Sequence, residues 1–103
     1  MGMELKAGTR LRSATDTTEV VVVKAPAEAI DLRCGGQPFV AIDADVTPAG
    51  PAAGFDAGTQ LGKRYADEAL GLELLCTKAG EGSISVGDAI LEVKGAKPLP
   101  ASD

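Results

Sequence analysis

The sequence of 103 residues contains no histidine and no tryptophan. Histidine is the commonest general base and the commonest metal ligand in proteins, so its absence excludes Ser-His and Cys-His nucleophile systems within this chain. The sequence also lacks a P-loop, a dinucleotide-binding fingerprint and a metalloprotease motif. We therefore expect a non-catalytic protein, and the sequence assigns no catalytic residue, no metal ligand and no cofactor.

Aromatic residues are scarce, since Phe39, Phe55 and Tyr65 are the only three. Hydrophobic residues nevertheless make up 45% of the chain, so Val, Ile, Leu and Ala must fill the core. A chain of this length forms one domain with a modest core. The shortage of aromatic side chains also leaves few of the rigid anchors that mark strong binding sites.

Excess positive charge and long apolar runs are absent as well. The net charge is −5, whereas nucleic-acid binding needs a surface of Lys and Arg that displaces counterions. The sequence shows no signal peptide, and no apolar run reaches the ~18 residues of a membrane-spanning helix. We expect a cytoplasmic protein that binds neither nucleic acid nor membranes.

The chain has two cysteines, Cys34 and Cys76, which lack the C-x-x-C spacing of a zinc or redox pair. Each lies at an inward position of an alternating segment, where a free thiol behaves as a small apolar side chain. This favours two buried structural thiols, with a disulfide, a metal site or a reactive thiol as alternatives. Cys34 is the better candidate for reactivity, because Gly35 and Gly36 leave it open and Arg33 is adjacent.

An internal repeat is the strongest signal in the sequence. Residues 7–11 and 57–61 agree at four of five positions, and the segment at 19–25 resembles that at 73–79. The matches are not in one register, because Gly8 aligns with Gly58 whereas Lys24 aligns with Lys78, and an insertion within residues 62–71 would explain the shift. The repeat predicts duplication of one β unit about a pseudo-twofold axis. Chance alignment of segments rich in Ala, Gly and Val is the alternative.

Short alternating segments separated by turn residues predict an all-β fold. Residues 65–75 are ambiguous, but Gly71 and the apolar alternation from Leu70 to Cys76 favour a strand over a helix. The prediction is a small β-barrel or sandwich built from two pseudo-twofold-related four-stranded units. The expected strands cover residues 9–14, 19–25, 30–34 and 39–42 in the first unit, and 58–61, 72–78, 83–86 and 89–94 in the second.

These predictions divide the single domain into four segments. Unit one covers residues 7–43, a linker rich in Pro, Gly and Ala covers 44–57, and unit two covers 58–94. Such a linker is expected to be mobile, and its one aromatic residue, Phe55, either fixes it to the body or has a functional role. Residues 95–103 are expected to form a flexible tail.

The leading functional hypothesis is an accessory or assembly subunit that binds a protein partner or itself as a homodimer. One alternative is a small apolar ligand bound inside the barrel or between the units, with the linker as a gate. Another is a thiol-dependent redox or metal protein that uses Cys34 or Cys76. Function is expected where the two copies differ, which gives the following candidate contact residues: Phe55, Cys34, Gly35, Gly36, Lys63, Arg64 and Tyr65.

Overall fold

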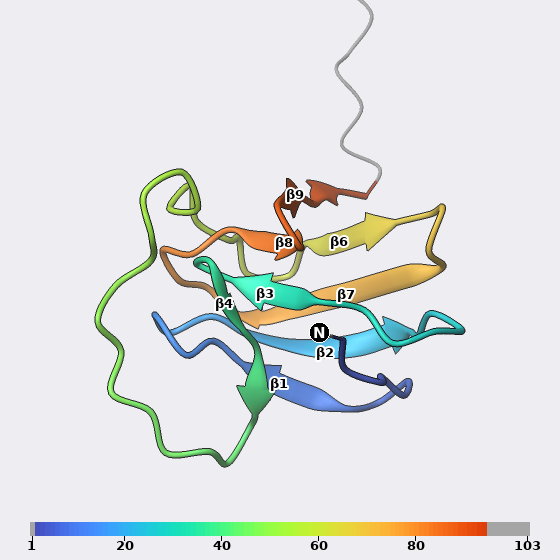
Figure 1. Ribbon diagram of the computed structural model, residues 1–103, viewed down its shortest axis with the longest axis horizontal. Coiled ribbons are helices and arrows are strands. Elements are labelled where there is room, and N and C mark those ends of the chain that lie inside the picture. The colour runs from blue at the N-terminus through green and yellow to red at the C-terminus, as the bar shows by residue number, and fades with distance from the viewer. Residues whose placement is uncertain (1, 95–103) are drawn as a thin grey trace, which may run out of the picture.

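The computed structural model describes residues 2–94, and every regular element in these residues is a β-strand (Figure 1). None of the described residues belongs to a helix that could cross a membrane. The predicted tail at residues 95–103 lies outside the described residues. The ten strands are β1 (Arg10–Arg12), β2 (Glu19–Lys24), β3 (Leu32–Cys34), β4 (Gln37–Pro38), β5 (Val40–Ala41), β6 (Arg64–Asp67), β7 (Leu72–Lys78), β8 (Ile84–Val86), β9 (Ala89–Ile90) and β10 (Glu92–Val93).

The strands form two antiparallel sheets, which confirms the all-β prediction. The larger sheet has the order β10-β6-β7-β2-β1-β5, and the smaller has the order β4-β3-β8-β9. A closed barrel, one of the two predicted architectures, is absent from the described part of the chain. The strands at the sheet edges are only two residues long, which is too short to wrap around and pair one sheet with the other.

One hydrophobic core joins the two sheets. In β2 the side chains alternate between buried and half-buried positions, so one face of the strand supplies the core. The same alternation occurs in β3, where Arg33 lies between two fully buried residues. The core is mainly aliphatic, as the composition predicts, and also contains Phe39, Tyr65 and the two cysteines. Its fully buried members include Val20 and Val22 of β2, Leu72 and Leu74 of β7, Leu32 and Cys34 of β3, and Ile84 of β8.

Two connections carry the chain from the smaller sheet to the larger one. Phe39 separates β4 from β5, and its amide donates a hydrogen bond to Leu32. Leu91 separates β9 from β10 in the same way, and its amide donates to Ile84. Both side chains are buried, so each anchors a change of sheet. The prediction of one continuous strand at 39–42, and of four strands per unit, is therefore wrong, because each half contains five.

The strand order of each sheet is symmetric about its centre. Each of β1–β5 lies at the position that mirrors the strand five places later in the chain, so β1 corresponds to β6, β2 to β7 and so on to β5 and β10. At the centre of the larger sheet Val21 is paired with Leu75, and Arg33 is paired with Ser85 in the smaller one. In the larger sheet the pairing Arg10–Val21 is repeated by Arg64–Leu75. In the smaller sheet the hairpin pairing Cys34–Gln37 is repeated by Val86–Ala89. The offset between matching positions is 54 residues in the larger sheet (64 − 10) and 52 residues in the smaller sheet (86 − 34). We call positions related by these offsets counterparts.

The register corrects the alignment that the sequence predicts. Residues 58–61 form no strand, and the counterpart of Gly8 is Gly62 rather than Gly58. Gly8 and Gly62 both have positive φ angles, of 91° and 83°, which glycine adopts without strain. Their amides donate to the counterpart carbonyls of Val22 and Cys76. The offset that relates Lys24 to Lys78 is already present at Gly62, so no insertion lies within residues 62–71. Duplication itself stays a prediction.

Candidate functional site

The molecule has two ends, defined by the loops that connect the central strands (Figure 1). One end contains residues 15–18, which join β1 to β2, and the loop at 80–83. Residues 50–57, which we call the strap, lie against these loops, so we call this end the strap end. The other end contains the counterpart loops at 26–30 and 69–71. We call it the open end, because the described residues include no counterpart of the strap there.

A buried carboxylate organises the strap end. Asp16 is only 6% exposed, and its Oδ2 accepts hydrogen bonds from the Thr18 hydroxyl at 2.6 Å and the Gly82 amide at 2.7 Å. Its Oδ1 accepts a further bond from the Thr15 hydroxyl at 3.1 Å. Burial acts to raise the pKa of Asp16, but the hydrogen bonds from Ser13, Thr18, Gly82 and Thr15 outweigh it and lower the pKa below its usual value. Asp16 is therefore ionised, and its hydrogen bonds connect the loop at 15–18 to the loop at 80–83.

Hydroxyl groups extend this cluster to the segment that follows the strap. The hydroxyls of Thr18 and Thr59 lie 3.1 Å apart, and the Gly80 amide donates to the Thr59 hydroxyl at 3.0 Å. Since Thr18 also donates to Asp16, these side chains belong to one hydrogen-bonded network. Such a network is stable in a protein interior only because its groups satisfy one another.

Most members of this polar network have apolar counterparts. Asp16 corresponds to Leu70, and Thr18 corresponds to the fully buried Leu72. Thr59 corresponds to Leu5, whereas Ser13 is an exception, because its counterpart is Asp67. The two cysteines beside the network also have apolar counterparts, Val22 for Cys76 and Val86 for Cys34. The same backbone arrangement therefore encloses a polar interior at one end and an apolar one at the other.

Both thiols lie beside the polar network and are free and buried. The Cys34 sulfur is fully buried 3.7 Å from Oδ1 of Asp16, and burial raises its pKa to about 12. Burial also raises the pKa of Cys76, whose sulfur donates to the Lys78 carbonyl at 3.3 Å. The prediction that glycines leave Cys34 open is wrong, because Thr15 and Pro51 lie directly against Gly35. A buried, protonated thiol is a poor nucleophile at neutral pH.

The strap lies across the turn that follows Cys34. The Gly50 amide donates to Thr15 and the Ala52 amide donates to Gly35, both at 2.9 Å, while the Ser83 amide donates to Phe55 at 2.8 Å. The half-buried Phe55 ring lies beside Gly36, 3.6 Å from where a Cβ would be. The structure thus brings together the candidate residues Phe55, Cys34, Gly35 and Gly36. Whether the remainder of the linker is mobile stays a prediction.

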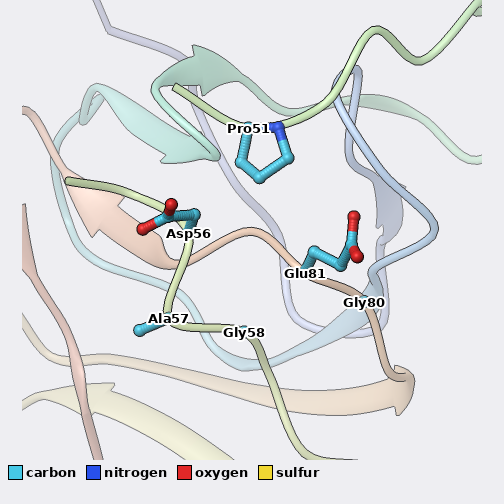
Figure 2. A pocket seen from close by; sticks show the side chains of 6 residues that line it. All are labelled: Pro51, Asp56, Ala57, Gly58, Gly80 and Glu81. Atoms are coloured by element: carbon cyan, nitrogen blue, oxygen red, sulfur yellow. The ribbon is translucent and has the colours of Figure 1, made fainter. Parts of the chain in front are cut away.

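Two shallow hollows flank the strap. The first has a volume of about 470 Å³ and carries the carboxylates of Asp56 and Glu81 on opposite sides, as Figure 2 shows. The second, of about 410 Å³, shares Glu81 and lies above Asp16 and Pro48. Among the described residues no three potential ligands gather to hold a metal ion. The first hollow is lined by Pro51, Asp56, Ala57, Gly58, Gly80 and Glu81.

The open end has a hollow of about 380 Å³ with a different lining. Leu70 is 37% exposed on one side of it, and Ile30 is buried on the other. Glu28 is its one charged lining residue. We call this hollow the open groove, and it is lined by Pro26, Ala27, Glu28, Ala29, Ile30, Ala69 and Leu70.

None of the hollows described at the two ends is lined by the remaining candidates, which are Lys63, Arg64 and Tyr65. Lys63 is exposed, and Arg64 contacts the carboxylate of Glu73 at 3.1 Å. Tyr65 is buried, which raises its pKa, and its hydroxyl accepts a bond from the Gln60 amide at 3.0 Å. The interpretation of these residues as an insertion is wrong, because Arg64 and Tyr65 belong to β6.

Sequence reasoning missed Asp16 and Glu73. The carboxylate of Glu73 contacts both Arg64 and Lys94, and the hydrogen bond from Lys94 lowers its pKa. Asp16 lies in a run of hydroxyl residues that is also typical of a solvent-exposed turn. The contrast of this run with the apolar Leu70 and Leu72 at the counterpart positions is the signal that identifies it.

No protein-family model, curated protein or solved structure matches this chain. The candidate site is therefore argued from its geometry alone.

Proposed function

We propose that the chain is a non-catalytic protein-binding module that docks a short segment of a partner in the open groove. The observation that carries this proposal is the difference between the two ends. The strap covers the strap end, whereas Leu70 remains 37% exposed in the open groove. At the open end the described residues leave an apolar surface exposed whose polar counterpart is covered by the strap, and an exposed apolar surface of this kind is a natural docking surface.

The groove is also held in place before any partner arrives. Met3 and Ile30 exchange two backbone hydrogen bonds, at 2.6 and 3.0 Å, which fix the loop that forms one wall. The Leu70 amide donates to the Asp67 carbonyl at 3.2 Å, which fixes the opposite wall. A preorganised groove loses little conformational entropy on binding.

The other hypotheses have less support. An apolar ligand inside a barrel needs a closed barrel with an interior space, whereas aliphatic side chains fill the core between the two sheets. A thiol-dependent enzyme needs an accessible thiolate, whereas both sulfurs are buried and burial raises the pKa of each.

The test compares two leucines that differ in place. Leu70→Arg puts a charge in the open groove, and Leu61→Arg makes the same change at a leucine that is 66% exposed outside it. Capture from a lysate of the natural host, followed by mass spectrometry, should recover a partner with the wild-type chain and Leu61→Arg but not with Leu70→Arg. Equal capture by all three folded chains would contradict the groove as the binding site. Light scattering of the purified chain tests whether the partner is a second copy.

We also propose that the fold arose by duplication of a five-stranded unit, followed by sequence divergence. The matching strand order, the constant offset between paired positions within each sheet and the pair Gly8 and Gly62 support this. A cytoplasmic location is proposed as well, because two free thiols suit a reducing compartment.

A further inference from the structure

We propose that the partner segment is a Pro- and Ala-rich peptide that resembles the strap. This inference rests on the proposed function and adds the chemistry of the partner. The strap itself is the model for such a peptide, because it lies on the counterpart of the open groove.

The strap shows how the fold holds a segment of this kind. Its bonds to Thr15, Gly35 and Ser83 use backbone groups, so they depend on the path of the backbone, which turns between Ala52 and Phe55, rather than on particular side chains. Pro51 of the strap lines one of the two hollows there, and Gly50 lines the other together with the preceding Pro48. Proline restricts the backbone, so a segment that contains it has less conformational entropy to lose on docking.

The open groove offers the counterpart of one of these contacts. Thr15 accepts the hydrogen bond from the strap residue Gly50, and its counterpart is Ala69. Within residues 2–94 the Ala69 carbonyl accepts no backbone hydrogen bond, so it is open to an amide of the partner. Asp16 lies beneath the second strap hollow, whereas its counterpart Leu70 lies in the open groove. The exchange of a carboxylate for a leucine favours proline rings and small apolar side chains there.

The direct test is titration of the whole chain with a fluorescent peptide that has the sequence of residues 46–57 of this chain. We expect saturable binding, weakened about tenfold or more by Leu70→Arg and unchanged by Leu61→Arg. A control peptide in which Gly replaces both prolines and Ser replaces phenylalanine should bind at least about tenfold more weakly.

Amide chemical-shift mapping then locates the peptide. Shifts at Ala27, Ala69 and Leu70 support the inference. Shifts confined to Thr15, Gly35 and Ser83 would mean that the peptide displaces the strap, which overturns it.

A chain that ends at Lys94 is the second form to titrate. The residues beyond it resemble the approach to the strap in sequence, because Ala96, Pro100 and Ala101 repeat the order and spacing of Ala44, Pro48 and Ala49. Tighter or equal peptide binding by the shortened form supports the inference, and weaker binding contradicts it.

Failure of the inference is distinguishable from failure of the proposed function. If the peptide does not bind at concentrations up to about 1 mM, while Leu70→Arg still abolishes capture of the natural partner, the partner has other chemistry and only the inference is wrong. If Leu70→Arg leaves partner capture unchanged, the groove is not the site and both are wrong.

Discussion

At the strap end a carboxylate is buried among hydroxyls, and at the open end its counterpart is a partly exposed leucine. Both side chains stand on the same turn between paired antiparallel strands, before β2 in one half and before β7 in the other. A carboxylate is tolerated in the interior only where donors surround it, and here Thr15, Thr18 and Gly82 provide them. The two ends share one backbone arrangement. A few side chains therefore determine which end is covered and which is accessible.

The largest expected effect comes from removing the carboxylate. Asp16→Ala leaves the buried Gly82 amide without its acceptor and removes one acceptor from each of the Thr15 and Thr18 hydroxyls, and we expect it to lower the free energy of unfolding by about 3 kcal/mol. Leu70→Ala at the counterpart position is the matched control and should cost less than about 1 kcal/mol, because Leu70 is partly exposed. Urea unfolding of both variants measures the difference. Equal losses would mean that the two ends are energetically alike.

A second comparison uses counterpart glycines. Gly35 and Gly87 have positive φ angles of 66° and 57°, so alanine at either position adopts a strained backbone. At Gly35 a Cβ also meets Thr15 and lies 3.0 Å from Cβ of Pro51, whereas nothing lies near Gly87. We expect a loss of about 2 kcal/mol for Gly35→Ala and about 1 kcal/mol for Gly87→Ala. Thermal or urea unfolding measures the loss of stability in each variant. Equal losses would show that neither Thr15 nor Pro51 of the strap crowds position 35.

Acid should weaken the strap end selectively. The pKa of Asp16 is lower in the folded protein than the usual value near 3.8, so its contribution to stability is fully present above that pH. The contribution is lost as the pH falls through the lower, folded-state pKa. Hydrogen exchange at the Gly82 amide should therefore lose protection below about pH 4. The Ile30 amide at the open end, which donates to the Met3 carbonyl, should keep its protection there. Simultaneous loss at both ends would contradict a local role for Asp16.

The smallest expected effect is chemical rather than energetic. Because burial raises the pKa of Cys34 to about 12, we expect almost no labelling by a thiol reagent at pH 7 in the folded state. Asp16→Ala should speed labelling of Cys34 by opening the turn above it, while Leu70→Ala should not. Mass spectrometry of the labelled peptides gives the rates. Rapid labelling of the wild-type chain would restore the reactive-thiol hypothesis.

These comparisons also show what the sequence can and cannot predict. The strand at Leu72–Lys78 was predictable, because its alternation and the unfavourable Gly71 are local signals. The strand at Arg64–Asp67 was not, because it depends on pairing with β7 and β10 on either side. The match of residues 57–61 to 7–11 was misleading, since Gly8 and Gly58 both have positive φ angles although they are not counterparts.

The candidate site was predictable to a smaller extent. Phe55 and the two glycines after Cys34 were singled out from the sequence, and the structure brings them together, with the Phe55 ring of the strap beside Gly36. The connection that Asp16 makes could not be predicted, because its hydrogen bond from Gly82 joins two loops from different halves of the chain. The open groove escaped notice for the same reason, since its walls also come from loops in different halves.

The pairing of β2 with β7 has a consequence for how the chain acquires its structure. These two strands meet at the centre of the larger sheet, and Val21 reaches its partner only once Leu75 has been synthesised. Neither half can cover the inner edge of its own sheet before the other arrives. Closure of so long a loop slows folding, so we expect a millisecond-to-second rate that is limited by the meeting of the halves. A ribosome-bound chain that lacks β7 should still expose the edge of β2 to chaperones.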